Sequence, residues 1–298
     1  MRIGAVRRGR LTAGGVLSTI GLVAAAACGS GKVAEGGGDA LAERARRVAD
    51  AWDGSSAAAA WRAGYHPTGE AVQLPRGGLR GVADQQAYER QNFKVRGTLP
   101  GAGAKDGKVT WAAAGGESVT RPLVGAKEAY ESPAGLRVDG VPQLMVERVE
   151  LGRMRMSTSR GPASVPAWVF TLAGYASPLK QAAAVPSKTP RPPIEAAHDL
   201  PGFPLDRLLR VSADGRAVTV VAMHGVCADG PAVDVLETRG SVVLSASVTG
   251  REDDRNCTSQ GKLERVEVRL SKPLGERVLL DAHSGKPVPY RGTNGLNP

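Results

Sequence analysis

The stretch LLRVSADGRAVTVVAM, residues 208–223, decides the fold class of this chain. Two apolar runs flank Asp214-Gly215, and glycine accepts the positive φ that a tight hairpin turn requires. The stretch therefore predicts a β-hairpin with strands at 208–211 and 217–223. Similar runs follow it, with expected strands at 233–235, 242–248, 266–270, 278–280 and 287–290. Short strands with frequent turns favour a small, sandwich-like all-β domain over residues 205–290.

A proline-rich stretch precedes this domain. Six prolines fall within residues 186–204, at positions 186, 190, 192, 193, 201 and 204. Proline removes a backbone donor and fixes φ, so the stretch cannot continue a central strand or a helix interior. We expect an extended connector here. Binding of this stretch to a partner domain as a polyproline II ligand is the alternative.

The region before the connector, residues 39–185, contains both the helical and the strand periodicity of apolar residues. Apolar residues at helical spacing predict a helix from Asp39 to Trp52, with a second short turn at 57–62. Alternating patterns then predict strands, with a short helix at 124–130 among them. The expected strands lie at 93–96, 108–111, 144–151, 153–156 and 168–172. The expected fold class is α+β: an N-terminal helix plus an antiparallel sheet domain, followed by the smaller all-β domain and a tail at 291–298.

The N-terminus is typical of an export signal. Four arginines lie within the first ten residues, Leu11 to Ala27 is uncharged and mostly apolar, and three alanines come directly before Cys28. The segment resembles the lipobox of bacterial lipoproteins, in which a peptidase cuts before a cysteine that carries diacylglycerol. A lipobox usually has leucine where this chain has Ala25. The resemblance implies a signal peptide at 1–27 and lipid attachment at Cys28.

Other interpretations of this segment remain open. A membrane-spanning helix needs about 20 apolar residues, and the apolar run is shorter. An ordinary signal peptide cut after Ala27 would leave Cys28 as a free thiol. Twin-arginine export fits Arg7-Arg8 less well. With lipid on Cys28, the glycine-rich segment 28–38 becomes a flexible tether, and the protein is anchored to the extracytoplasmic face of the cell membrane.

Composition limits the partners. The formal net charge of +10 falls to about +6 without the four signal arginines. A basic surface outside the membrane attracts anionic lipids or wall polymers, and Arg153, Arg155 and Arg160 are the candidate contact. A GC-rich coding sequence also explains this composition. Location and the lack of a recognised motif disfavour nucleic acid, while an envelope protein is an alternative partner.

The remaining cysteines form an even pair. With Cys28 attached to lipid, Cys227 and Cys257 are left in an oxidising compartment, where disulfides persist. We expect these two residues to be bonded to each other. Oxidised cysteines do not bind zinc, and no calcium-loop spacing is present, so the sequence predicts neither a metal nor another cofactor.

Two short motifs are candidates for catalysis. His224-Gly225-Val226-Cys227 is similar to the Ser-His-Gly-Cys motif of L,D-transpeptidases, but Met223 replaces the serine and Val226 adds a residue. A disulfide at Cys227 would remove its thiolate. Ser177-Pro178-Leu179-Lys180 matches the S-x-x-K of penicillin-binding proteins without a companion motif at suitable spacing. We expect that the protein is not an enzyme. The alternative is a wall-modifying activity that uses Cys227 or Ser177.

One resemblance covers most of the chain after the tether. It rests on segments 158–161, 166–170 and 273–277 together with Cys227, Cys257, Asp281-Ala282 and Gly285. These segments resemble an uncharacterised family of actinobacterial lipoproteins. The resemblance implies an envelope protein with a paired cysteine and no assigned activity. The resulting interpretation is a membrane-anchored binding or interaction module. A two-lobed solute-binding protein is disfavoured because strands and helices do not alternate regularly.

Overall fold

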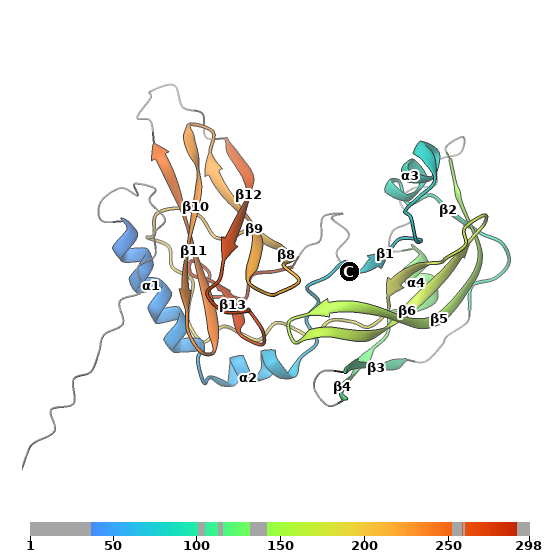
Figure 1. Cartoon of the computed structure of the whole chain (residues 1–298), viewed down its shortest axis with the longest axis horizontal. Coiled ribbons are helices and arrows are strands. Elements are labelled where there is room, and N and C mark those ends of the chain that lie inside the picture. Colours follow the sequence, from blue (N-terminus) through green and yellow to red (C-terminus); the bar gives the residue numbers. More distant parts are fainter. Residues whose placement is uncertain are drawn as a thin grey trace, which may run out of the picture. The chain divides into compact units, whose positions relative to one another are not determined.

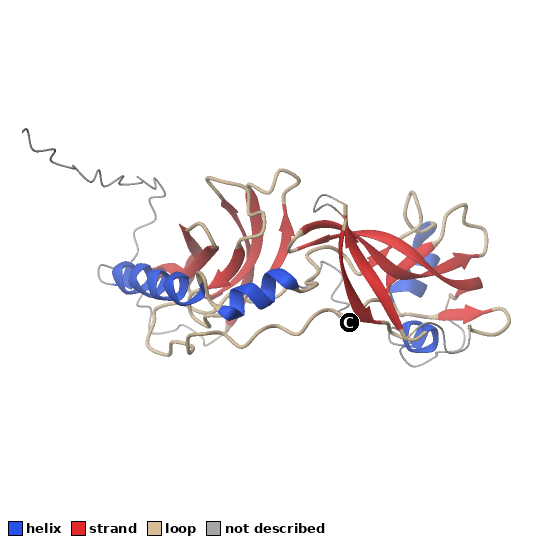
Figure 2. Ribbon diagram, turned by 90° about the horizontal axis from the view of Figure 1, so that it is seen from below, coloured by secondary structure: helices blue, strands red, loops and turns tan. Residues whose placement is uncertain are grey.

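The computed structural model describes residues 37–100, 105–112, 116–131, 142–251, 258 and 260–290. Cys28, Cys257, the predicted signal peptide and the tail at 291–298 lie outside these residues. The described residues belong to one compact unit. Most of their regular structure is β-sheet, with four helices at its margins (Figures 1 and 2).

Two helices open the described chain. They are α1 (Gly37–Trp52) and α2 (Ser56–Ala63), which confirms the helix predicted from Asp39 to Trp52. The hydroxyl oxygen of Ser55 accepts a hydrogen bond from the Ala58 N–H at 3.1 Å. This cap satisfies a donor that the first turn of α2 leaves without an intrahelical partner.

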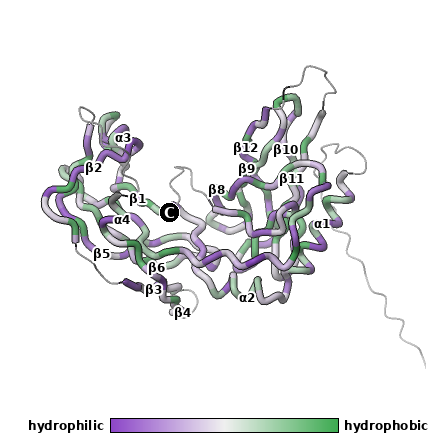
Figure 3. The backbone as a smooth tube through the Cα atoms, turned by 180° about the vertical axis from the view of Figure 1, so that it is seen from behind, coloured by the Kyte–Doolittle hydropathy of each residue, from purple (hydrophilic) through white to green (hydrophobic). Residues whose placement is uncertain are grey.

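The first sheet has seven strands. Its main path runs β1-β7-β6-β3-β4, β5 pairs with the other side of β6, and β2 pairs with β5. The long β5–β6 hairpin forms the centre of this sheet, and hydrophobic and hydrophilic residues alternate along it (Figure 3). The bounds are β1 (Val72–Gln73), β2 (Phe93–Val95), β3 (Asp106–Trp111), β4 (Glu117–Pro122), β5 (Leu144–Thr158), β6 (Gly161–Leu172) and β7 (Leu179–Ala182).

Two further helices border this sheet. They are α3 (Gly81–Glu89) and α4 (Ala126–Glu131), and only α4 was expected from the sequence. Ala87 of α3 and Ala126 and Ala129 of α4 belong to the same buried cluster as Val146 and Phe170 of the β5–β6 hairpin. Small side chains on the helices therefore allow close packing against larger side chains of the sheet.

The C-terminal region contains two three-stranded sheets, ordered β10-β11-β13 and β12-β9-β8. Leu208, Val220 and Val268 from one sheet share a buried cluster with Leu244 from the other. The predicted hairpin is present between β8 and β9, and Gly215 has φ of 71°. The bounds are β8 (Arg207–Val211), β9 (Ala217–Gly225), β10 (Ala228–Glu237), β11 (Ser241–Arg251), β12 (Gly261–Arg269) and β13 (Val278–Asp281).

The sheets are mixed, which corrects the expectation of a purely antiparallel domain. β2 pairs parallel to β5, and β11 pairs parallel to β13. Parallel neighbours require a long connection. The segments between these strands supply it: β3, β4 and α4 follow β2, and β12 in the other sheet follows β11. The pairing therefore depends on long connections that local strand patterns do not specify.

Helix α1 packs on the C-terminal strands (Figure 1), whereas the sequence predicted that it belongs with the first sheet. Val48 and Trp52 cluster with Val243 and Leu280. The neighbouring residue of β11, Leu244, points into the other cluster, between the two C-terminal sheets. Both faces of β11 are thus buried, which explains its nearly continuous run of apolar and small residues.

Residues 185–206 contain neither helix nor strand. The Ala197 N–H donates to the His283 carbonyl at 2.8 Å, and Gly202 adopts φ of 89°. A Cβ on Gly202 would lie 2.4 Å from the Ala246 carbonyl oxygen, so only glycine fits this approach to β11. The strand expected at 287–290 is reduced to single bridges, Leu280 with Pro287 and Leu208 with Tyr290.

Among the residues that the structure describes, no helix combines the length and the apolar character that crossing a bilayer requires.

Candidate functional site

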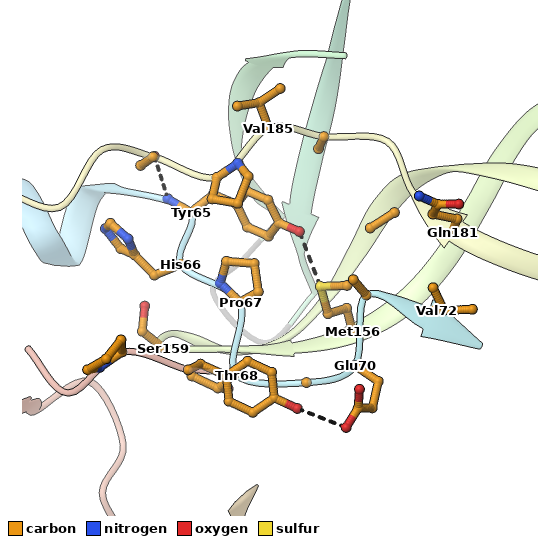
Figure 4. A pocket seen from close by; sticks show the side chains of 18 of the residues that line it. Tyr65, His66, Pro67, Thr68, Glu70, Val72, Met156, Ser159, Gln181 and Val185 are labelled. Carbon is orange, nitrogen blue, oxygen red and sulfur yellow. Dashed lines mark hydrogen bonds between the residues drawn. The ribbon is translucent and has the colours of Figure 1, made fainter. Parts of the chain in front are cut away.

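A cavity of about 650 Å³ lies beside the segment 65–72, which joins α2 to β1 (Figure 4). Strands β6 and β7, residues 184–187 at the start of the connector and the C-terminal residues 287–290 also line it. Most of its lining is apolar, including Val72, Phe93, Val124, Phe170, Leu179 and Val185. Cavities of roughly 300–1,000 Å³ with a mainly apolar lining and few polar groups are typical small-molecule sites.

Hydrogen bonds fix the segment 65–72 at both ends. Two of them join Tyr65 to Ser187: the Tyr65 N–H donates to the Ser187 hydroxyl at 2.9 Å, and the Ser187 N–H donates to the Tyr65 carbonyl at 2.8 Å. Near the other end, the Ala182 N–H donates to the Ala71 carbonyl at 2.8 Å. This wall of the cavity is therefore anchored to the connector and to β7.

Tyr65 lies deep in this wall. Its side chain is fully buried, and its hydroxyl donates to the Met156 sulfur at 3.1 Å (Figure 4). Burial raises the pKa of Tyr65, because the apolar surroundings disfavour the phenolate. Tyr65 is thus a neutral structural side chain that joins the segment 65–72 to β5.

His66 is a buried histidine on the same segment. Its ring stacks on Trp61 with 3.8 Å between ring centroids. Burial, and secondarily the charge of Arg121, lowers the pKa of His66 to about 4. The imidazole is therefore neutral near pH 7. Its Nε2 atom has no hydrogen-bond partner in the described part of the chain.

Glu70, Tyr88 and Tyr290 are polar residues that line the cavity. The Tyr290 hydroxyl donates to Glu70 Oε1 at 3.5 Å (Figure 4). Burial raises the pKa of Tyr290 to about 12, and the Glu70 charge adds to this effect. The pKa of Tyr88 is raised by the same two causes, burial first. Two neutral phenols therefore share the surroundings of one carboxylate.

The predicted basic contact lies outside the cavity. Arg153 and Arg155 project from the exposed face of β5, as the alternation with Met154 and Met156 predicts. Arg153 donates to the Ser164 hydroxyl at 2.7 Å. Arg160 is different: it stacks over the Trp111 ring at 4.1 Å and pairs with Glu117. Contact of these arginines with an anionic polymer stays a prediction.

The S-x-x-K motif is not on a helix. Ser177 precedes β7, and Lys180 is within that strand. The Ser177 oxygen accepts a hydrogen bond from the Arg76 N–H at 2.7 Å, while Lys180 Nζ donates to the Arg153 carbonyl at 3.2 Å. The two side chains therefore have separate partners, and the helical turn that this motif uses elsewhere is not formed.

The other motif spans the end of β9. His224 is buried, its Nδ1 lies 2.9 Å from the Gly225 carbonyl oxygen, and its Nε2 lies 3.3 Å from Glu264 Oε2. Cys227 lies in the turn between β9 and β10. Neither His224 nor Cys227 lines the cavity.

The strand pairing supports the predicted disulfide. The residue after Cys227 pairs with Arg251, and the N–H of the residue before it donates to the Gln260 carbonyl at 3.1 Å. Arg251 and Gln260 flank the segment that contains Cys257, which lies outside the described residues. Both flanks of that segment are therefore next to Cys227. The bond itself stays a prediction.

We expect Cys227→Ser to lower the free energy of unfolding by about 3–4 kcal/mol, because a bridge that closes a loop of roughly 30 residues restricts the unfolded chain by this amount. Urea unfolding under oxidising conditions would measure the loss. Reductant should lower the free energy of unfolding of the unmodified protein by the same amount and leave that of Cys227→Ser unchanged. Alkylation of Cys227 in folded protein without prior reduction would contradict the pairing.

Among the described residues, no group of three or more histidine, cysteine, aspartate or glutamate side chains is placed to hold a metal. No protein-family model, curated protein or solved structure matches this chain. The cavity itself was not predicted. Glu70, Tyr88 and Tyr290 are isolated in the sequence, and no motif or spacing connects them.

Proposed function

We propose that this protein is a membrane-anchored, non-enzymatic binding protein of the cell envelope, and that its cavity binds the apolar part of an amphiphilic small molecule. The apolar lining of the 650 Å³ cavity is the observation that carries this proposal. Removing an apolar ligand surface from water stabilises the complex by about 25 cal/mol per Å² before the cost of association is subtracted. The lipobox-like segment before Cys28 supports a location at a membrane, where such molecules are abundant.

The positions of the candidate nucleophiles support binding over catalysis. Ser177 and Cys227 do not line the cavity. His66 does line it, but its lowered pKa of about 4 makes the imidazole a weak base, and the ring is stacked on Trp61. The groups that do face the cavity are mainly aliphatic and aromatic side chains, which suit binding by hydrophobic contact.

A variant that fills the cavity tests the proposal. Ala182 in β7 lines the cavity and is half-buried. We expect Ala182→Phe to weaken binding of the neutral fluorescent probe N-phenyl-1-naphthylamine at least tenfold, because the added ring occupies the volume that the probe needs. Fluorescence titration would measure saturable binding to the full protein.

The matched control is Ala232→Phe. Ala232 is also a half-buried strand residue, in β10, and it does not line the cavity. Its variant should change the probe affinity less than twofold. Thermal unfolding monitored by circular dichroism would verify that both variants fold. The proposal fails if the unmodified protein shows no saturable binding, or if a folded Ala182→Phe variant binds as well as the control.

A further inference from the structure

Residues 77–91, which contain α3 (Figure 1), lie between two points that the first sheet holds in place. Before this segment, β1 pairs with β7, and Pro75 is buried. After it, Asn92 is buried, its side-chain amide donates to the Pro142 carbonyl at 3.1 Å, and its carbonyl accepts from the Leu144 N–H at 2.9 Å. The segment itself contributes no strand to the sheet. Both of its ends are therefore attached to the sheet, while the residues between them are not.

The apolar contact between this segment and the sheet is small. Ala87 is the one buried residue of α3, and Leu79 and Tyr88 add partly buried contacts with the same cluster. Val82 of α3 is 72% exposed, the highest value for a large hydrophobic side chain in the described part of the chain. Elements that bury few apolar groups separate from a fold at a low free-energy cost.

The turns on either side of α3 have the character of hinges. Gly77, Gly78 and Gly81 adopt φ of 88°, 82° and 61°. A Cβ added to any of them would meet no atom within 4 Å, so the backbone conformation, and not a lack of space, requires glycine there. On the other side, Gln91 has φ of 57° and its N–H donates to the Tyr88 carbonyl at 2.9 Å. A few such residues absorb the backbone changes of a hinge motion.

One side chain of the sheet holds the beginning of α3. Tyr175 lies between β6 and β7, and its hydroxyl accepts from the Arg80 N–H at 2.8 Å and donates to Asp84 Oδ2. The Arg80 guanidinium also lies over the Tyr175 ring, 4.9 Å from its centroid. These contacts are polar and near solvent, where water replaces lost hydrogen bonds at a small net cost. Tyr175 is therefore a specific attachment that is easily released.

The other end of α3 forms part of the cavity wall. Tyr88, in the last turn of the helix, and Gln91, just after it, line the cavity. Val72 and Phe93 line it too, but they belong to β1 and β2, which are paired within the sheet. A rotation of the segment about its two turns would move Tyr88 and Gln91 away from the cavity and leave the strands in place.

We infer that residues 77–91 form a lid, which opens to admit and release the cavity ligand, and that Tyr175 is the latch that keeps the lid closed. This inference rests on the proposed binding function. It adds the route into the cavity and the contact that controls the rate of exchange.

Stopped-flow fluorescence of N-phenyl-1-naphthylamine with the full protein tests the inference. Tyr175→Phe removes the hydroxyl that joins Arg80 to Asp84 and keeps the ring. We expect it to raise the association and dissociation rates together by about tenfold, because the lid opens more often with and without the probe. The dissociation constant should then change less than about threefold. Unaltered rates in folded Tyr175→Phe would overturn the latch.

Asp84→Ala and Glu89→Ala form a matched pair on α3. Asp84→Ala removes the carboxylate that accepts from Tyr175, and should raise both rates about threefold. Glu89 is exposed, contacts Gln85 of the same helix at 3.3 Å and should be replaceable without effect on the rates. An equal change in the two variants would show that the rates respond to the helix charge and not to the latch.

Amide hydrogen exchange separates the lid from the proposed function, because it needs no ligand. Residues 79–89 should exchange faster in Tyr175→Phe than in the unmodified protein, while the β5–β6 hairpin should exchange equally in both. Faster exchange without any saturable probe binding would uphold the lid motion and overturn the proposed function. Probe binding with unchanged exchange in residues 79–89 would overturn the lid and leave the cavity proposal intact.

Discussion

Replacing Cys28 with alanine is expected to move the protein from the membrane fraction to the soluble fraction. Each acyl methylene buried in a bilayer contributes about 0.8 kcal/mol, and two or more chains hold a folded domain stably at the membrane. Alanine has no thiol to accept the lipid. Fractionation of cells, followed by immunodetection of the protein, would measure the change, and it is the largest effect that we expect from any single substitution.

Ser30→Ala is the control for Cys28→Ala, because it changes the predicted tether and leaves the cysteine intact. A high-salt wash separates the two sources of membrane attachment: it screens the attraction of a basic protein to anionic lipids but does not release an acyl anchor. Unchanged membrane attachment of salt-washed Cys28→Ala would contradict the lipoprotein interpretation. An unmodified Cys28 at the mature N-terminus would instead favour an ordinary signal peptide.

Replacing Trp52 with alanine is expected to lower the free energy of unfolding by about 3–5 kcal/mol, as for other large buried aromatic residues. The Trp52 side chain is fully buried between α1 and the strands β11 and β13. Its indole N–H donates to the Gly285 carbonyl at 2.8 Å, so the substitution also leaves a buried acceptor without its partner. Urea unfolding monitored by circular dichroism would measure the loss.

Two variants make the Trp52 result specific. Trp52→Phe keeps most of the apolar contact and removes the N–H, so it should lose about 1–3 kcal/mol. Trp61→Ala removes a partly exposed tryptophan from α2 and should lose less than Trp52→Ala. A stability change below about 1 kcal/mol for Trp52→Ala would show that α1 is not an integral part of the fold.

Local signals in the sequence predict the elements that depend on near neighbours. The β8–β9 hairpin was predictable because Asp214-Gly215 specifies its turn within a few residues. Helix α1 was predictable because its apolar residues recur at helical spacing. Helix α3 was missed, and its short sequence buries only Ala87. A helix with so little apolar surface carries a weak periodic signal.

The candidate site depends on distant residues, and this is why the sequence did not predict it. Glu70 and Tyr290 are separated by 220 positions. Their contact requires that the segment after α2 and the last described residues reach the same cavity. The parallel pairs of β2 with β5 and of β11 with β13 have the same origin. No turn residue or short spacing encodes such pairings.

The packing of α1 on β11 and β13 also constrains the order in which the chain can fold. Because synthesis begins at the N-terminus, α1 is made long before Val243 and Leu280, which cover its apolar face. An isolated helix of this length is only marginally stable in water. Closing contacts across such a large sequence separation is slow. The apolar face of α1 therefore stays uncovered until nearly all strands have been made, so it is open to non-native contacts in the unfinished protein that the native protein does not allow.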